Sequence, residues 1–488
     1  MAAKIKKGQA FKTVQGKVTG RRERGGPFDG PFVGDDTEQS ERKTRRVRTA
    51  RRPRELKEPS PGTPARNLND DPGDPRDNPV VFHAYQPTSD VGPKKNTNAA
   101  DLSGGASEEN VVMITGNWFC DFSVDGGLNY KRVSPPSFFT TPLAGGFCCD
   151  QIMIFVPGLN RFVWLMQHDT DANGSGAFRL AMASPADIKN DFSTAWTFWD
   201  FIADDFNLKG VWLDFPDMAY TDEFLHITID AVERGGTLIV RIPLKEMALG
   251  GTINFRFNNP DDSKSTTLCH LVQSAQDRAI WAGHIDNTTV QLFTWLDSST
   301  SYSSASVKVA TWPNGALVSK GPNGNNWLGR AGNSILGGVR SGDHLRLAWT
   351  ASDGQGGGAG FKFPNAHVRV AEIDLNTNVT LGEMQVWNND YAFAYPSLNV
   401  NAKGEIGIMV GWGGKANDAN TASGIIGDFV VWYQDGSTFT NSRWGDYISA
   451  RKTQRNSNLF AGFGYFTKAD PGDAAGWFAV PYYVLFGR

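Results

Sequence analysis

The chain repeats one pattern of residues seven times, and this repeat limits its fold more than any other feature. Each unit has a short polar or Pro- and Asp-containing start, an apolar run, a turn, and a second apolar run that ends in aromatic residues. The starts lie about 50 to 70 residues apart, the spacing of an array of supersecondary units. The seven units begin at Ala100, Cys149, Asp214, Cys269, Gly337, Tyr395 and Gly445, and the copy at Ala100 is the least regular.

Further strand-like runs follow most of these pairs, so each unit has the length of a four-stranded antiparallel meander. Examples are "GAFRLAMA" at 176–183 and "AWTFWDFI" at 195–202. We therefore predict an all-β fold, a seven-bladed β-propeller over residues 79–488. A six-bladed ring is the alternative, if the unit at Ala100 merges with the last blade. The last unit lacks a fourth strand, so "NPVVFHAYQ" at 78–86 is predicted to supply it and close the ring.

The charge of the chain is divided unevenly between its two parts. Residues 1–80 hold 19 Lys and Arg against 12 Asp and Glu, and the remainder holds 29 against 39. A basic run, "ERKTRRVRTARRPRELKEP", precedes a Pro- and Asp-rich stretch that disfavours a lasting helix or strand. We expect residues 1–78 to form a mostly disordered arm. It is either a nucleic-acid, packaging or targeting arm or a solvated extension without a specific partner.

One short stretch, "FSVDGGLNY" at 122–130, has the chemistry of a turn between two strands. Asp125 can accept hydrogen bonds from amides just downstream, and Gly126 and Gly127 tolerate positive φ. With "GGFCCDQIMIFVPGLNRFVWLMQ" and "RWGDYISAR", this stretch resembles the BNR/Asp-box sialidase-like β-propeller superfamily over residues 80–488. The resemblance implies a turn that holds a hairpin far from the propeller axis.

Polar residues at the starts of the innermost strands are predicted to face one another around that axis. We take four of them as candidate catalytic groups and six as candidate ligand-binding groups. The alternative is that each side chain bonds backbone and fixes neighbouring blades together. The catalytic candidates are Asp150, Asp214, Tyr447 and His270, and the ligand-binding candidates are Gln151, Asp217, Arg340, Tyr395, Arg443 and Asp446.

The sialidase mechanism that the resemblance implies needs three arginines, an Asp acid/base and a Tyr nucleophile activated by Glu. Tyr447 with Asp446 imitates the last pair, but no Glu adjoins Tyr447 in the sequence. The Arg-Ile-Pro motif occurs only at Arg241, on an expected third strand that would direct it away from the axis. The catalytic set is therefore incomplete.

Three hypotheses of function remain. The first is a glycan- or protein-recognition propeller, supported by 12% aromatic residues. The second is a glycan-active hydrolase or lyase at the central channel. The third is a structural or cargo protein in which the basic arm mediates packaging or targeting.

The remaining signals concern cysteines, metals and localisation. Cys148 and Cys149 are expected to be two buried thiols, with a vicinal disulfide as the alternative. Asp169, Asp171 and Asn173 resemble the start of a calcium loop but favour a hairpin turn, and no pattern indicates a cofactor or a metal. Because the sequence shows neither a signal-like start nor a membrane-length apolar run, we expect a cytoplasmic protein, with signal-independent export as another route.

Overall fold

A computed structural model describes residues 100–260, 270–356, 361–427, 444–469 and 477–488 with their side chains. Outside these ranges it describes the backbone of short strands at 5–10, 12–19, 21–22, 60–61, 81–85 and 431–433. All statements about the structure concern these residues. The expected domain boundary near residue 78 lies outside them.

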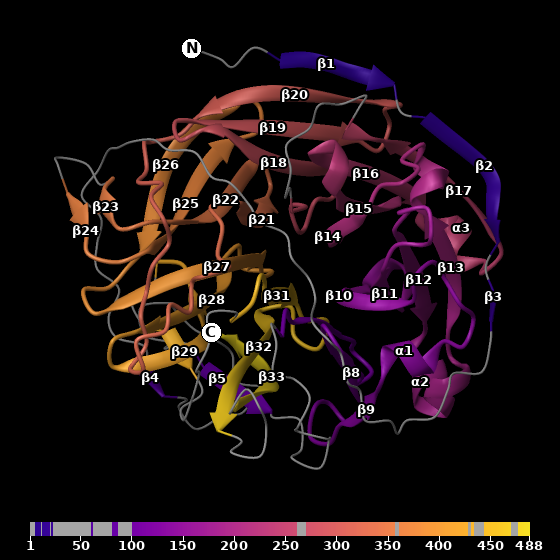
Figure 1. Ribbon diagram of the computed structural model, residues 1–488, viewed down its shortest axis with the longest axis horizontal. Coiled ribbons are helices and arrows are strands. Elements are labelled where there is room, and N and C mark those ends of the chain that lie inside the picture. The colour runs from indigo at the N-terminus through magenta and orange to yellow at the C-terminus, as the bar shows by residue number, and fades with distance from the viewer. Residues whose placement is uncertain are drawn as a thin grey trace.

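Seven antiparallel meanders stand in a ring, each with one edge at the centre and the other at the rim (Figure 1). The protein is a seven-bladed β-propeller, which confirms the sequence-based count and excludes six blades. Blade 1 is β6 (Ser103–Ala106), β7 (Val112–Gly116), β8 (Phe119–Ser123) and β9 (Lys131–Val133). Blade 2 is β10 (Phe147–Val156), β11 (Arg161–His168), β12 (Ala177–Ala183) and β13 (Thr197–Ile202). Blade 3 is β14 (Leu213–Tyr220), β15 (Phe224–Ala231), β16 (Gly236–Pro243) and β17 (Thr252–Asn258).

The next blades are less regular. Blade 4 is β18 (Arg278–Asp286), β19 (Thr289–Leu296) and β20 (Ser301–Lys308). Blade 5 is β21 (Ile335–Ser341), β22 (His344–Ala351), β25 (His367–Asp374) and β26 (Val379–Val386), with a side hairpin of β23 (Gly354–Gln355) and β24 (Lys362–Phe363). Blade 6 is β27 (Tyr391–Val400), β28 (Ile406–Gly414), β29 (Asn417–Ile425) and β30 (Val431–Tyr433). Blade 7 is β31 (Ser449–Lys452), β32 (Leu459–Ala469), β33 (Trp477–Gly487) and β5 (Val81–Tyr85).

Ring closure occurs in blade 7, where the chain's early strand meets its last one. β5 pairs antiparallel with β33, from Val81 opposite Gly487 to Tyr85 opposite Tyr483. This is the pairing that the sequence predicts for residues 78–86. It joins segments about 400 positions apart and covers the edge of the last blade.

The innermost strand of blade 4 differs from the prediction. Residues 270–273 make only isolated bridges, Leu271 with Trp281 and Gln273 with Val339. The backbone at Ser274 and Gln276 adopts positive φ, which interrupts a regular ladder. The segment therefore bonds blade 4 on one side and blade 5 on the other.

Four short strands lie in the N-terminal region, which the sequence predicts to be mostly disordered. β1 (Ile5–Ala10), β2 (Lys12–Thr19) and β3 (Arg21–Arg22) pair with the outer strands β20, β17 and β13 of blades 4, 3 and 2 (Figure 1). β4 (Ser60–Pro61) pairs in parallel with β30. These short segments pair because the unpaired edges of the blades offer them hydrogen-bond partners.

Buried tryptophans repeat in the second strand of four blades and fill the space between neighbouring sheets. Trp164, Trp281, Trp349 and Trp412 are each at most 2% exposed. Large aromatic side chains contribute more buried area than other residues, and they favour strands. The repeat in the sequence is therefore a repeat of core positions.

Bulges recur in the innermost strands. The ladder shifts between Phe147 and Gln151 in β10, between Asp214 and Asp217 in β14, and between Ala394 and Ser397 in β27. Each shift coincides with a non-glycine residue at positive φ: Cys149 in β10, Phe215 in β14 and Tyr395 in β27. Asp101, just before β6, has the same backbone conformation. A bulge redirects side chains locally, so it changes which residues face the axis.

The cysteine prediction is wrong in part. Cys148 and Cys149 form a vicinal disulfide, and the positive φ of Cys149 at the β10 bulge is the backbone feature that accompanies it. Cys120 is a buried free thiol, and Cys269 lies outside the described residues.

Helices are short and occupy the connections between strands. They are α1 (Pro135–Phe138), α2 (Pro185–Asp191) and α3 (Leu244–Ala248), with 3-10 turns at Pro157–Leu159, Phe192–Thr194, Ala203–Phe206 and Val232–Arg234. In the described part of the chain, no helix has the length and apolar composition that crossing a membrane would require.

Candidate functional site

Several predicted site residues do meet at the axis. The Nδ1 atom of His270 lies 3.8 Å from Oδ2 of Asp217, and the rings of His270 and Tyr447 are 6.2 Å apart. Phe215 packs against both rings, at 4.9 Å from His270 and 5.8 Å from Tyr447. The cavity among these side chains measures about 20 Å³, which is enough for a water molecule but too small for a sugar ring.

A second group of acidic residues continues this cluster between blades 7 and 1. An oxygen of Asp101 accepts a hydrogen bond from the backbone amide of Asp446, and its other oxygen accepts one from Asn117 at 2.9 Å. The guanidinium of Arg330 contacts Asp446 at 2.8 Å. Burial raises the pKa of Asp101 to about 7, and the charge of Asp446 contributes to the rise. We call Asp101, Asp217, His270, Asp446 and Tyr447 the axis cluster.

Tyr447 is poorly suited to act as a nucleophile. Its hydroxyl donates to the carbonyl oxygen of Gln151 at 3.5 Å. Burial raises the pKa of Tyr447 well above its usual value, and the negative charges of Asp150, Asp101 and Asp446 raise it further. The phenol therefore stays protonated. The charged groups that raise its pKa are Asp carboxylates.

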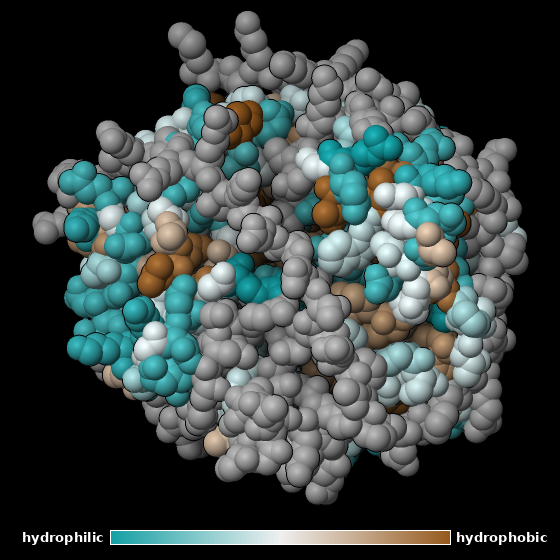
Figure 2. Space-filling view, in the orientation of Figure 1, coloured by the Kyte–Doolittle hydropathy of each residue, from teal (hydrophilic) through white to brown (hydrophobic). Residues whose placement is uncertain are grey.

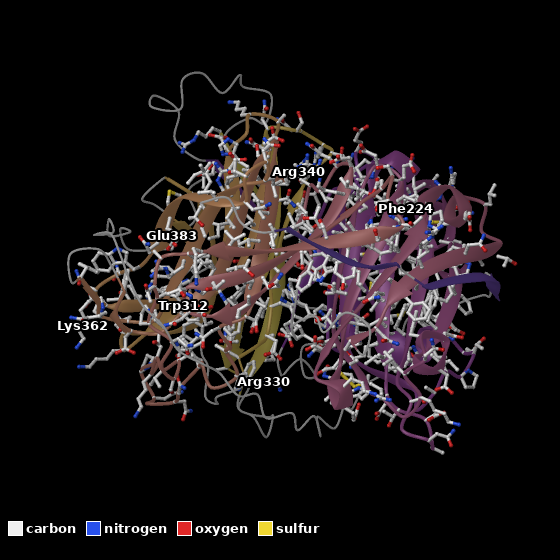
Figure 3. The ribbon with its side chains drawn as sticks, turned by 90° about the horizontal axis from the view of Figure 1, so that it is seen from above. Phe224, Trp312, Arg330, Arg340, Lys362 and Glu383 are labelled. Carbon is white, nitrogen blue, oxygen red and sulfur yellow. A yellow bond between two sulfur atoms is a disulfide. The ribbon has the colours of Figure 1, made fainter. Side chains whose placement is uncertain are left out.

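The other predicted residues are not all brought to the same place. Arg340 lies at the opposite end of the molecule from Arg330 (Figure 3), where it bonds the carbonyl of Ala275 at 2.7 Å and the carboxylate of Asp277. Tyr395 packs against Trp444 at 5.2 Å. Arg443 lies outside the described residues. The prediction that Arg340 faces the other candidates is wrong, because it stands at the end of β21 and not at its start.

Arg241 occupies the third strand of blade 3, as expected from the sequence. Its guanidinium is sandwiched between Phe224 at 4.2 Å and Trp295 at 4.0 Å and donates to the carbonyls of Leu296 and Ser299. It joins blades 3 and 4 and does not approach the axis cluster.

Residues in the inner and second strands connect the blades to one another at every junction of the ring. In most cases a polar side chain of one blade bonds the backbone of the next. Asp217 Oδ2 accepts from Leu271 N at 2.9 Å, and Gln151 Nε2 donates to Phe119 O at 3.1 Å. The remaining junctions are bonded by Gln167 with Asp214, Gln273 with Gly338, Tyr395 with Thr350, Asn399 with Ala450, and Ser449 with Leu102. The alternative interpretation from the sequence, that these residues fix neighbouring blades together, describes most of the predicted set.

Two expected turns are present, each held by an Asp side chain. Between β8 and β9, Oδ1 of Asp125 accepts from the amides of Leu128 and Asn129, at 3.1 and 3.0 Å. Between β11 and β12, Asp171 accepts from the amides of Asn173 and Ser175. Both lie between strands, away from the inner edge of their blades.

Sequence reasoning missed a larger cavity, which lies on blade 2. It has a volume of about 370 Å³ and lies between the connection that follows blade 1 and the strands β11 and β12. We call it the blade-2 cavity; its lining includes Pro135, Phe139, Thr140, Phe147, Met166, His168 and Arg179. The signal in the sequence was the run "SPPSFFTTPL" at 134–143, whose prolines and aromatics do not fit the strand repeat.

Comparisons with known proteins give distant likenesses only. No protein-family model matches the chain, and no curated protein has a matching sequence. Among solved structures, the α-L-arabinofuranosidase Arb93A of Fusarium graminearum is 10% identical with a TM-score of 0.36, over 83% of this chain and 96% of that one. The α-L-arabinanase of Penicillium chrysogenum is 8% identical with a TM-score of 0.37, over 82% and 96%. The sialidase of Trypanosoma rangeli is 10% identical with a TM-score of 0.34, over 76% and 60%. TM-scores this low decide nothing about family, substrate or mechanism, and the propeller assignment rests on the strand order.

Proposed function

We propose that this chain is a recognition propeller that binds a glycan or protein ligand without acting on it chemically. The observation that supports this proposal is the use of the axis residues. The four candidates for catalysis are buried. The Tyr447 hydroxyl donates to the carbonyl of Gln151, Asp214 accepts from the Gln167 side chain, and the cavity beside His270 and Tyr447 measures about 20 Å³. A hydrolase needs its acid, base and nucleophile within reach of a bound substrate.

The electrostatics of the cluster agree with this proposal. A retaining glycosidase of the sialidase type needs an activated Tyr, and the pKa of Tyr447 is raised, not lowered. It also needs several arginines on one carboxylate, whereas Arg340 and Arg241 are engaged elsewhere. Inner strands that are bonded to one another around the ring suit a scaffold that presents a surface or a pocket.

The test is a glycan array with the purified protein, run beside hydrolysis assays with fluorogenic sialoside and arabinofuranoside substrates. We expect array binding, or capture of a defined protein ligand, with no turnover of either substrate. Turnover that disappears in Tyr447→Phe while the melting temperature stays within a few degrees would overturn the proposal in favour of a glycan-active enzyme.

A second candidate function, a structural or cargo protein, is favoured by the pairing of β1, β2 and β3 with three blades. In this case the strands β1, β2 and β3, which we call the belt, stabilise the ring in addition to any function of the basic arm. Deletion of residues 1–22 should then lower the melting temperature by several degrees, because three outer edges lose their partner strands. An unchanged melting temperature would show that the belt contributes nothing to stability.

A further inference from the structure

The blade-2 cavity has the size and position of a ligand site away from the propeller axis. Its volume of about 370 Å³ falls in the range of small-molecule sites, about 300 to 1,000 Å³. Residues 135–143, including α1, form one side, and β11 and β12 contribute Met166, His168 and Arg179. Figure 2 shows apolar residues at the surface in the region of β11 and α1.

Apolar side chains form much of the lining. Pro135, Phe139, Leu143, Phe147 and Met166 supply rings and aliphatic groups, and most of them are buried. Such surfaces gain free energy when they cover the apolar face of a ligand. A sugar ring has one face of C–H groups that fits against proline and aromatic rings.

The polar groups of the lining carry no available charge. Ser137, Thr140 and Thr141 bring hydroxyl groups to the lining. Burial lowers the pKa of His168 to about 3, and the charge of Arg179 lowers it further, so the imidazole is neutral at pH 7. The imidazole is hydrogen-bonded to the backbone of Leu143 and Gly146. A hydroxyl group has one donor and two acceptor positions, so Ser137, Thr140 and Thr141 suit a ligand rich in hydroxyl groups in addition to the bonds that they already make.

Arg179 is the one charged side chain in this lining, and its charge is already paired. Its Nε and Nη2 atoms contact the two carboxylate oxygens of Asp200 at 2.7 and 3.0 Å. It is 1% exposed and lies 4.4 Å from the ring of Phe198. A ligand carboxylate would have to compete with Asp200, so the lining disfavours acidic sugars.

The cavity is held open by bonds that do not depend on a ligand. Nη2 of Arg179 donates to the carbonyl of Thr141 at 3.0 Å, which ties the 135–143 segment to β12. The amide of Gly145 donates to the carbonyl of Asp169, and the amide of Asp169 donates to Gly146. A preformed site loses less entropy when a ligand binds.

From this geometry we propose that the blade-2 cavity binds one or two units of a neutral carbohydrate, and that it is the ligand site of the recognition propeller proposed above. The inference rests on that proposed function and narrows it to a site and a ligand class. It places binding on one blade, between the first two repeats, and not in the central channel.

The experiment uses the full chain and variants that close the mouth of the cavity. Ser137 and Thr140 are exposed residues of the lining, so Ser137→Trp and Thr140→Trp place a large ring there with little cost to the core. Ser298→Trp is the matched control, because Ser298 is exposed in the turn between β19 and β20 on blade 4. Melting temperatures establish that each variant is folded.

Binding is measured by ligand-observed NMR and calorimetry with galactose, glucose, arabinose, N-acetylglucosamine and their β-linked disaccharides, beside sialic acid and glucuronic acid. We expect at least one neutral sugar to bind, the acidic sugars to bind at least tenfold more weakly, and both mouth variants to weaken binding at least tenfold. Ser298→Trp should bind like the wild type.

Neutral-sugar binding that survives both mouth variants, stronger binding of the acidic sugars, or no binding of any sugar would each overturn the inference. The glycan array separates this failure from failure of the proposed function. Array binding that persists in the mouth variants refutes only the cavity, whereas catalytic turnover refutes the recognition function itself.

Discussion

The axis cluster and the blade-2 cavity both contain buried polar side chains that are bonded within the protein, but the two regions differ in the space that remains beside those side chains. At the axis, Asp101 and Asp217 accept backbone amides of neighbouring blades, and about 20 Å³ remains open. On blade 2, Arg179 is paired with Asp200 beside about 370 Å³ of open space. The comparison teaches that a concentration of polar residues does not by itself make a binding site. What matters is whether space is left beside those residues for a ligand.

The largest expected effect is on the axis side of this comparison. Asp217→Ala removes the acceptor of the Leu271 amide and the carboxylate that offsets the buried charge of Arg451. We expect the free energy of unfolding to fall by about 3 kcal/mol, measured by urea denaturation, with no effect on sugar binding at the blade-2 cavity. The exposed Asp343→Ala is the control; a loss below about 1 kcal/mol in Asp217→Ala would show that this residue does not fix the blades together.

The pH dependence of stability tests Asp101. Its pKa is raised to about 7 in the folded protein, so the folded state holds a proton that the unfolded state has released. The stabilisation is full below about pH 4 and is lost as the pH rises through about 7. The variant Asp101→Asn has no carboxyl group to titrate at this position. The unfolding free energy of the wild type minus that of the variant should therefore fall by on the order of 2 kcal/mol between pH 4.5 and 7.5. A difference that stays constant across this range would contradict the assigned protonation.

An intermediate effect is expected at the turn between β8 and β9, which belongs to neither region. Asp125→Ala removes hydrogen bonds to the amides of Leu128 and Asn129. Since the turn is largely exposed, thermal denaturation should show a loss of about 1 kcal/mol and unchanged ligand binding. Asp125→Asn, which keeps an acceptor oxygen, should recover part of it. Reduced ligand binding in a folded Asp125→Ala protein would show that this turn takes part in recognition.

The smallest effect on stability is expected at the mouth of the blade-2 cavity. Thr140 is exposed, so Thr140→Ala should change the free energy of unfolding by less than about 0.5 kcal/mol while it weakens neutral-sugar binding. This pattern is the reverse of that expected for Asp217→Ala. A Thr140→Ala protein that loses stability but not binding would remove the distinction between the two regions.

Much of the fold could be read from the sequence because the repeat is a property of local patterns. Alternating apolar runs with turn residues predict strands, and their sevenfold recurrence predicts the blades. The last unit lacks a fourth strand, and the sequence predicts that residues 78–86 supply it. β5 lies in this segment and pairs with β33. The charge pattern, in contrast, did not reveal that β1, β2 and β3 pair with outer strands, because edge pairing uses backbone groups that every residue has.

The candidate site was predicted less well, for reasons that concern tertiary structure. The sequence placed Asp217, His270 and Tyr447 at the starts of inner strands, and they do lie near one another. Whether a carboxylate in that position meets a ligand or the amide of the next blade depends on the distance between blades. The bulges at Cys149, Phe215 and Tyr395 set these directions, and no residue pattern specified them.

By itself, then, the sequence determined the repeating strands and the turn at Asp125 and favoured seven blades over six, since each follows from residues near one another in the chain. Only the tertiary structure decided that the cavity at the axis cluster measures about 20 Å³, that Cys148 and Cys149 are bonded, and that a cavity opens beside Arg179. Packing between distant segments determines which polar groups find partners and where space remains, and local sequence carries no direct record of either.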